Sequence, residues 1–166
     1  MKWGKSKNVN SSSEFITEWN ASSSKGIIVV NCHGAPTTML DLGIEDVNAL
    51  DNLSCDCLIL LGCNLGHYDF EWSNIAFAFS RKINGGVVVA SDGTVYSLLD
   101  LGYQRFRSKN DKTYKGYCTD TTRANKGWVL YRKSGTTIYW HYTGLYTISI
   151  PSVIDYLIGQ DMFAIN

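Results

Sequence analysis

The amino-acid sequence predicts an α/β fold with a mostly parallel sheet, helices on both faces and a C-terminal antiparallel hairpin. Three short apolar runs occur in the first hundred residues, at Ile27–Val30, Cys57–Leu61 and Val87–Ala90. None of them alternates with polar residues, which is typical of strands buried on both faces. Segments with helical spacing separate the runs, and this strand–helix order indicates parallel strands joined by crossover helices.

The segments around the apolar runs carry helix signals. Ile44–Leu50 and Trp72–Ile83 place apolar residues at helical spacing, and Glu14–Asn20 is expected to form a short helical turn. Asn84–Gly86 is expected to end the helix over 72–83, because glycine readily adopts the left-handed conformation that a helix C-terminus needs.

The last third of the chain has a different pattern. Trp128–Arg132 and Thr136–Tyr142 are rich in aromatic and β-branched residues and are joined by Lys133–Gly135, which predicts an antiparallel hairpin. Its aromatic residues are expected to be core, although some of them could wall a substrate cleft. Pro151–Ile158 is expected to form a closing helix with proline in its first turn.

Composition excludes several classes of protein. The chain has 166 residues, 45% of them hydrophobic and 18% charged, which suits one domain and excludes a disordered protein. The formal net charge is zero, so neither a nucleic acid nor a membrane surface is an expected partner. The apolar runs are too short to span a bilayer.

The basic residues are unevenly distributed. Acidic side chains outnumber basic ones before residue 100 and the balance reverses after it, mainly between Arg105 and Lys126. This Gly-, Thr- and Asn-rich stretch is interpreted as an exposed loop, either simply solvated or in contact with an acidic partner. It is also a hypothetical site of regulatory proteolytic cleavage.

The cysteine count is odd, so the thiols cannot all pair internally. The five cysteines are Cys32, Cys55, Cys57, Cys63 and Cys118. The polar N-terminal segment lacks the apolar core of a secretory signal. A reducing compartment is therefore the expectation, although a domain of a larger secreted protein would carry the same pattern.

Three segments are expected at the carboxyl edge of the sheet, where ligands bind in open α/β folds. They are Asn31–Gly34, Gly62–Gly66 and Ser91–Gly93, and the first two carry His33 and Cys63. A cysteine becomes a nucleophile when a neighbouring imidazole can take its proton. Strands that end in His and Cys side by side therefore predict a catalytic pair.

The same segments supply candidate groups around that pair. Acyl transfer needs N–H donors for the developing oxyanion, and the amides of Gly34 and Cys63 are the candidates. Asn64 and His67 follow closely and could orient a substrate. Asp92 could line the cleft as a carboxylate for a basic substrate residue, or it could be the ordinary turn aspartate of Ser-Asp-Gly.

A metal site is the main alternative for the same side chains. The set comprises Cys32, His33, Cys55, Cys57, Cys63 and His67. Its Cys-x-Cys and Cys-x₃-His spacings differ from the Cys-x₂-Cys of common zinc sites, so no metal is expected. No Gly-x-Ser-x-Gly elbow or phosphate-binding glycine loop occurs, which argues against a serine hydrolase and a nucleotide enzyme.

The two predicted edge segments resemble the caspase-like superfamily of cysteine peptidases, which includes caspases, gingipains, clostripain and bacterial relatives. That family places His-Gly after one buried strand. It places a turn of the form (Ala/Gly/Ser)-Cys-x-x-Gly after the next buried strand. Ile27–Gly34 and Leu58–Gly66 match this pattern. Asn74–Ser80 and Gly86–Gly93 also look like caspase-like domains of large bacterial proteins, so the resemblance covers about residues 26–96.

The resemblance implies a caspase-like three-layer sandwich and a thiol peptidase. Cys63 would be the nucleophile, His33 the general base and acid, and Gly34 with Cys63 the oxyanion hole. No cofactor would be needed. The expected partner is a polypeptide substrate, which could be the chain itself or a parent protein, and the activity could be self-processing or associated with a toxin or effector.

The expected domain organisation follows from the same match. Residues 1–25 would be a loose N-terminal segment, and 26–166 a single domain with its core at 26–96 and the hairpin and helix at 127–166. Two other functions stay open, namely a non-catalytic interaction module with the same fold and a metal-binding domain.

Overall fold

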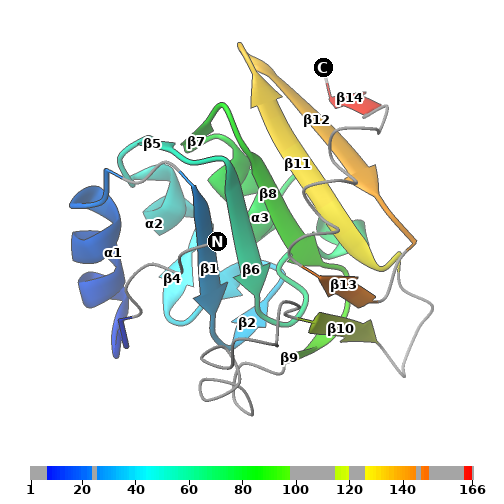
Figure 1. Cartoon of the computed structure of the whole chain (residues 1–166), viewed down its shortest axis with the longest axis horizontal. Helices are drawn as coiled ribbons and strands as arrows, with labels where there is room; N and C mark the ends of the chain where they lie inside the picture. Colours follow the sequence, from blue (N-terminus) through cyan, green and yellow to red (C-terminus); the bar gives the residue numbers. More distant parts are fainter. Residues whose placement is uncertain are drawn as a thin grey trace, which may run out of the picture.

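The main feature of the fold is a six-stranded mixed sheet with strand order β1-β6-β8-β11-β12-β14 (Figure 1). The computed structural model describes residues 7–23, 26–97, 115–119, 126–144, 147–149 and 163–165. The strands of the main sheet are β1 (Ile27–Asn31), β6 (Cys57–Leu61), β8 (Val87–Ser91), β11 (Trp128–Ser134), β12 (Thr137–Tyr142) and β14 (Phe163–Ile165).

The first three strands form the parallel core that the apolar runs predict. β1 pairs in parallel with β6, and β6 pairs in parallel with β8. Every residue of β6 and β8 is buried. Leu58 and Leu60 belong to the core cluster shared with the helices, while Ile59 on the opposite face is also buried. The absence of polar alternation therefore correctly indicates burial on both faces for β6 and β8. It is wrong for β1, whose residues are at most half-buried because β1 lies at the edge of the sheet.

The second half of the sheet corrects the prediction of a mostly parallel sheet. β8 pairs antiparallel with β11, β11 with β12, and β12 with β14, so the antiparallel pairings outnumber the parallel ones. Trp128 at the start of β11 faces Ser91 at the end of β8. The chain thus re-enters the sheet at the edge where β8 leaves it and must run back antiparallel. The predicted hairpin is confirmed, with Gly135 in the turn at φ +61.

Three helices are described, and their starts follow from capping residues. They are α1 (Ser12–Asn20), α2 (Ile44–Asn48) and α3 (Ile75–Ser80). Before α3 comes a single 3₁₀ turn, η1 (Tyr68–Phe70). The side chain of Asn74 accepts the N–H of Phe77 at 2.8 Å and begins α3 there. The helix expected over Trp72–Ile83 is therefore shorter at both ends, and Ile83 lies in a strand.

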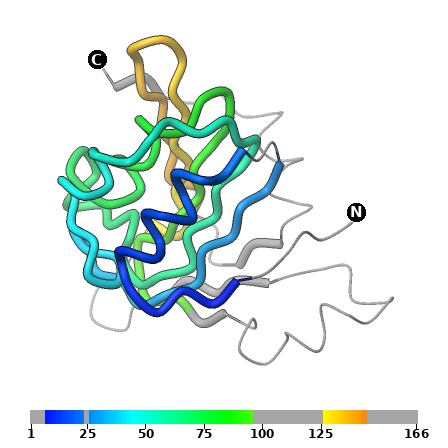
Figure 2. The backbone as a smooth tube through the Cα atoms, turned by 90° about the vertical axis from the view of Figure 1, so that its left-hand side faces the viewer, coloured from blue at the N-terminus to red at the C-terminus, as the bar shows by residue number. Residues whose placement is uncertain are grey.

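All three described helices pack in one layer (Figure 2). Phe15 and Trp19 of α1 contact Phe79 of α3, with ring centroids 6.2 and 5.1 Å apart. Phe15 and Trp19 are buried, so the segment 1–25, expected to be loose, contains a helix of the core. Helices on both faces are not seen in the described part of the chain. The expected helix Pro151–Ile158 lies outside the described residues.

Short strands form three smaller sheets beside the main one. They are β2 (Gly34–Ala35), β3 (Thr38–Met39), β4 (Leu42–Gly43), β5 (Leu53–Ser54), β7 (Ile83–Asn84), β9 (Thr94–Ser97), β10 (Lys115–Thr119) and β13 (Thr147–Ser149). β10 falls in the stretch Arg105–Lys126 that was expected to be a loop, and it pairs antiparallel with β9. The rest of that stretch, apart from Lys126, lies outside the described residues.

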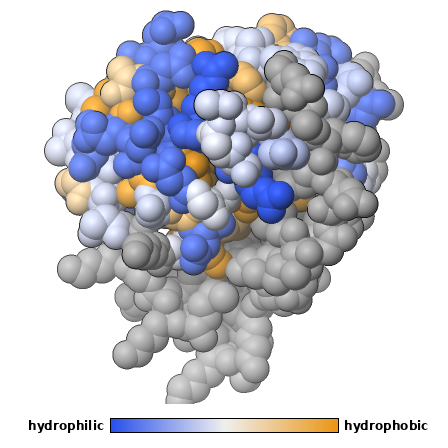
Figure 3. Space-filling model, turned by 90° about the horizontal axis from the view of Figure 1, so that it is seen from above, coloured by the Kyte–Doolittle hydropathy of each residue, from blue (hydrophilic) through white to orange (hydrophobic). Residues whose placement is uncertain are grey.

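The three parallel strands end at the same edge of the main sheet. β1, β6 and β8 all point to the lower edge in Figure 1, which is the edge predicted to carry the site. The opposite end, seen in Figure 3, is mostly hydrophilic, with separated hydrophobic areas among its described residues. None of the described helices has the length and hydropathy of a membrane span.

Candidate active site

The structure brings the His33 and Cys63 segments together at the ends of β1 and β6. Asn31 is the register partner of Leu61. The N–H of Cys32 donates to Leu61 O at 3.3 Å and extends the ladder by one residue. His33 and Cys63 each follow that point by the same number of residues. Their backbones are therefore neighbours across two adjacent parallel strands.

A leucine that the sequence analysis did not single out holds the two turns together. A Cβ at Gly34 would lie 2.5 Å from Leu65 Cδ2 and 3.1 Å from Cys63 O. A Cβ at Gly62 would lie 2.5 Å from Leu65 Cδ1 and 3.1 Å from Cys32 O. Leu65 is fully buried and occupies the space that both glycines leave. The close packing of Leu65 therefore favours glycine at both positions. The two glycines were the sequence feature that could have indicated this close packing.

The turn that carries Cys63 is fastened to the end of β8. The N–H of Asn64 donates to Gly93 O at 2.9 Å, and the N–H of Gly66 donates to Ser91 O at 2.9 Å. Asn64 has φ +58, a left-handed conformation that costs a non-glycine residue about 1 kcal/mol. Its Oδ1 is buried and accepts no hydrogen bond from the described residues. Backbone strain of this kind concentrates at functional sites.

Cys63 and Cys32 are the less buried of the described thiols. Cys63 is half-buried and His33 is exposed, whereas Cys55 and Cys57 are buried. Burial raises the pKa of Cys57 to about 12. Burial, followed by the charge of Cys63, raises the pKa of Cys32 to about 12. These thiols stay protonated at neutral pH and are poor nucleophiles.

The two predicted oxyanion donors are the amides of Gly34 and Cys63, whose backbones are close together, since a Cβ at Gly34 would lie 3.1 Å from Cys63 O. His33 O accepts from the N–H of Leu40 at 3.2 Å, so these residues form a hydrogen-bonded pair beyond the β2–β3 ladder. Bonding direction alternates along an antiparallel ladder, so the N–H of Gly34 faces away from β3. The N–H of Cys63 is absent from the loop and turn hydrogen bonds found between described residues. The Gly34 amide thus points off its local ladder.

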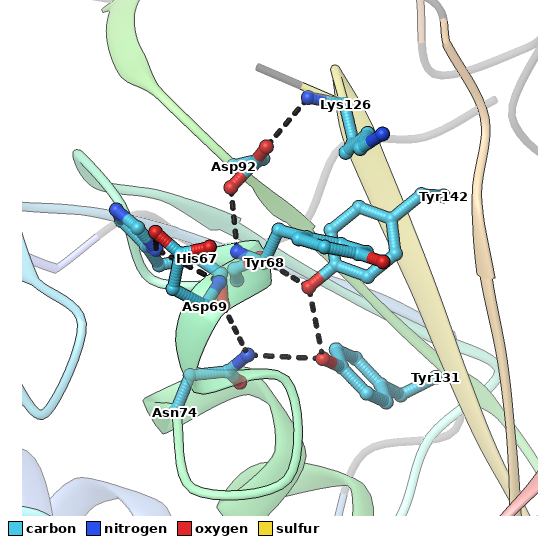
Figure 4. A network of polar contacts seen from close by, with 9 residues as sticks. His67, Tyr68, Asp69, Asn74, Asp92, Lys126, Tyr131 and Tyr142 are labelled. Atoms are coloured by element: carbon cyan, nitrogen blue, oxygen red, sulfur yellow. Dashed lines mark hydrogen bonds and ion pairs between the residues drawn. The ribbon is translucent and has the colours of Figure 1, made fainter. Parts of the chain in front are cut away.

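Asp92, one of the predicted pocket residues, has a structural position. It is fully buried. Its carboxylate accepts the N–H of Tyr68 at 2.6 Å and the N–H of Lys126 at 2.5 Å (Figure 4). Asp92 thereby joins η1 to Lys126, two residues before β11. It is not placed to line a cleft, and its alternative interpretation as a turn aspartate is the better one.

His67, another predicted pocket residue, caps η1. Its Nδ1 accepts the N–H of Asp69 at 3.2 Å, and its ring packs edge-on against Phe70 at 5.4 Å. An Nδ1 that accepts a hydrogen bond places the proton of the neutral ring on Nε2. The carboxylate of Asp69, 4.0 Å from Nδ1, would pair with it only if the ring were protonated. The direct role of His67 is thus in shaping the chain after Cys63.

A buried polar network ties the hairpin to this same chain segment (Figure 4). Asn74 Nδ2 donates to the hydroxyl of Tyr131 at 2.9 Å, and that hydroxyl donates to Glu71 O at 2.8 Å. The hydroxyl of Tyr142 donates to Gly66 O at 2.8 Å. Burial raises the pKa of Tyr131 to about 12. No spacing in the sequence signals this network, because its members are far apart along the chain.

Replacing Tyr131 with phenylalanine is expected to lower the free energy of unfolding by about 1–3 kcal/mol, because Asn74 and Glu71 lose a buried partner. The matched control is Tyr139→Phe, because Tyr139 is only half-buried and lies on the neighbouring strand. Denaturant unfolding monitored by circular dichroism measures both variants. Equal losses in the two variants would show that the network contributes no specific stability.

The described residues do not support the metal alternative. Within 7–23, 26–97 and the later described segments, no three His, Cys, Asp or Glu side chains gather in a way that could hold a metal ion. The six Cys and His residues of the alternative set therefore do not come together as the ligands of one metal ion.

No protein-family model matches the sequence, and no curated protein matches it.

Proposed function

We propose that the chain is a cysteine endopeptidase of caspase-like type that uses His33 and Cys63. The observation that carries the proposal is the register of β1 and β6, which brings His33-Gly34 next to Cys63 at the carboxyl edge. The parallel β1-β6-β8 core with a helix layer also supports a caspase-like sandwich as the finer fold class. The proposed partner is a polypeptide substrate.

The proposed reaction proceeds in two halves. His33 takes the proton of the Cys63 thiol as the sulfur attacks the carbonyl carbon of the peptide bond, and the amides of Gly34 and Cys63 stabilise the oxyanion. The C–N bond then breaks and His33 gives the proton to the leaving amine. A water molecule, deprotonated by His33, attacks the thioester and releases the acid and the free thiol.

Site-resolved labelling with iodoacetamide at neutral pH tests this proposal. Cys63 is expected to react at least about tenfold faster than the buried thiols, because they are shielded and carry raised pKa values. The diagnostic result is a loss of that advantage in His33→Ala, because exposure alone would leave the labelling rate unchanged. Mass spectrometry of tryptic peptides follows each thiol separately.

The matched control is Thr37→Ala, an exposed change in the turn between β2 and β3. It is expected to leave the labelling of Cys63 unchanged. If Cys63 reacts at the same rate in the wild type and in His33→Ala, the pair does not act as a dyad. The non-catalytic interaction module would then be the better description.

A further inference from the structure

An unusual surface segment follows the candidate nucleophile turn. Residues 68–72 alternate aromatic and acidic side chains, in the order Tyr68, Asp69, Phe70, Glu71, Trp72. Tyr68, Phe70 and Trp72 are 36%, 41% and 48% exposed, and they make up three of the four large hydrophobic residues found exposed in the described chain. Aromatic side chains usually avoid such exposure, so this clustering indicates a binding surface.

The exposed rings continue onto β12 and form one connected surface. Trp72 packs edge-on against Trp140 at 6.1 Å, Trp140 against Tyr142 at 5.6 Å, and Tyr142 against Tyr68 at 5.1 Å. We refer to these four rings as the aromatic shelf. Tyr142 also donates to Gly66 O, which connects the shelf to the turn that carries Cys63.

A carboxylate lies within this shelf without its full set of partners. Glu71 Oε1 accepts the indole N–H of Trp72 at 2.8 Å. Glu71 Oε2 is buried and accepts no hydrogen bond from the described residues. A buried carboxylate oxygen without a partner is costly, and a bound cation would supply what it lacks.

The shelf already accommodates one ammonium group of this chain. Lys126 Nζ lies 5.0 Å from the centre of the Tyr68 ring, within the range of a cation–π interaction. Figure 4 shows Lys126 and Tyr142 beside Tyr68. The side chain of Asp69 is 66% exposed and adds negative charge nearby. Ring faces and two carboxylates together favour a positively charged ligand.

We propose that the aromatic shelf and Glu71 form a binding site for a lysine side chain of a polypeptide partner. The ammonium group would lie over the rings, where the negative charge of the Glu71 carboxylate attracts it. Lysine fits better than arginine because Oε1 is occupied by Trp72, which removes the bidentate pairing that favours a guanidinium group. The lysine methylenes would pack on the apolar ring surface.

The site is independent of the proposed peptidase chemistry, because none of its residues belongs to the His33–Cys63 pair. The test therefore uses the full chain with Cys63→Ala, so that no cleavage interferes. The probe is the blocked peptide acetyl-Gly-Ser-Lys-Ser-Gly-amide. NMR follows the indole N–H signals of Trp72 and Trp140 during titration, after assignment with Trp72→Phe and Trp140→Phe.

A saturable shift of both indole signals is expected. The same peptide with Nε-acetyl-lysine should bind at least about fivefold more weakly, because it lacks the charge that the rings and Glu71 attract. Glu71→Gln keeps the acceptor for Trp72 and should weaken binding of the lysine peptide by about fivefold or more. Glu45→Gln, which removes the same charge at an exposed position of α2, should leave affinity unchanged.

Three results would overturn the proposal. One is the absence of a saturable shift up to ~10 mM peptide, beyond which a specific site has no useful affinity. Another is equal affinity for the lysine and acetyl-lysine peptides, which would indicate an apolar surface only. The third is equal affinity of Glu71→Gln and Glu45→Gln, which would reduce the effect to net charge.

Discussion

Replacing Cys63 with alanine is expected to reduce peptide hydrolysis by at least about 10³-fold, because no other described thiol follows β6 at its carboxyl end. His33→Ala should cause a loss of similar size. The double variant should be no worse than either single one, since a nucleophile and its base act as a unit. Cleavage of a quenched fluorescent peptide library measures all three.

The control for this prediction is Cys32→Ser, which removes the neighbouring thiol and leaves the proposed pair intact. It is expected to keep activity within a few-fold of the wild type. Thermal unfolding of each variant verifies that the fold is preserved. A Cys63→Ala protein that cleaves as fast as the wild type would exclude Cys63 as the nucleophile. A double variant with the product of the two single losses would show that His33 and Cys63 act separately.

Replacing Gly86 with alanine is expected to cost at least about 3 kcal/mol of unfolding free energy, the upper part of the range for overpacking. A Cβ there would overlap Cys55 O and lie 2.7 Å from Asp56 O. Both are backbone atoms next to β6, and Asp56 O also accepts the N–H of Val87 at 3.2 Å. They cannot move without displacing a central strand of the sheet.

The neighbouring glycine provides a matched control. Gly85 has φ +81, and a Cβ there would meet no atom within 4 Å. Gly85→Ala should therefore lower the free energy of unfolding by only about 1–2 kcal/mol, which is the cost of holding alanine in the left-handed conformation. Urea unfolding of both variants gives the comparison. A Gly86→Ala protein as stable as Gly85→Ala would mean that the chain before β8 adjusts easily, contrary to its close packing.

The aromatic and acidic residues of 68–72 show where sequence patterns stop being informative. Helical spacing favoured one helix over Trp72–Ile83, and the apolar positions Ile75 and Phe79 are indeed buried. Trp72 fits the same spacing but lies before the Asn74 cap, exposed at the surface. Spacing identifies a helix, whereas the cap decides where its buried face begins.

Features that depend on local patterns could be predicted from the amino-acid sequence. The apolar runs identified β1, β6 and β8 as strands, and β6 and β8 are buried on both faces as an uninterrupted apolar run predicts. The strand-to-turn breaks with paired glycines identified His33 and Cys63 as the ends of two such strands. The hairpin of β11 and β12 followed from its aromatic and β-branched residues around a short turn.

Which elements become neighbours depends on the strand order of the folded sheet. The direction of β11 depends on the edge at which the chain returns to β8, and no local pattern encodes that edge. The burial of Asp92, the placement of Leu65 between two glycines, and the link from Tyr131 to Asn74 all join residues whose partners are set by strand order. Local propensity selects the elements, but long-range packing selects their neighbours, since burial and hydrogen bonding are satisfied only in the assembled sheet.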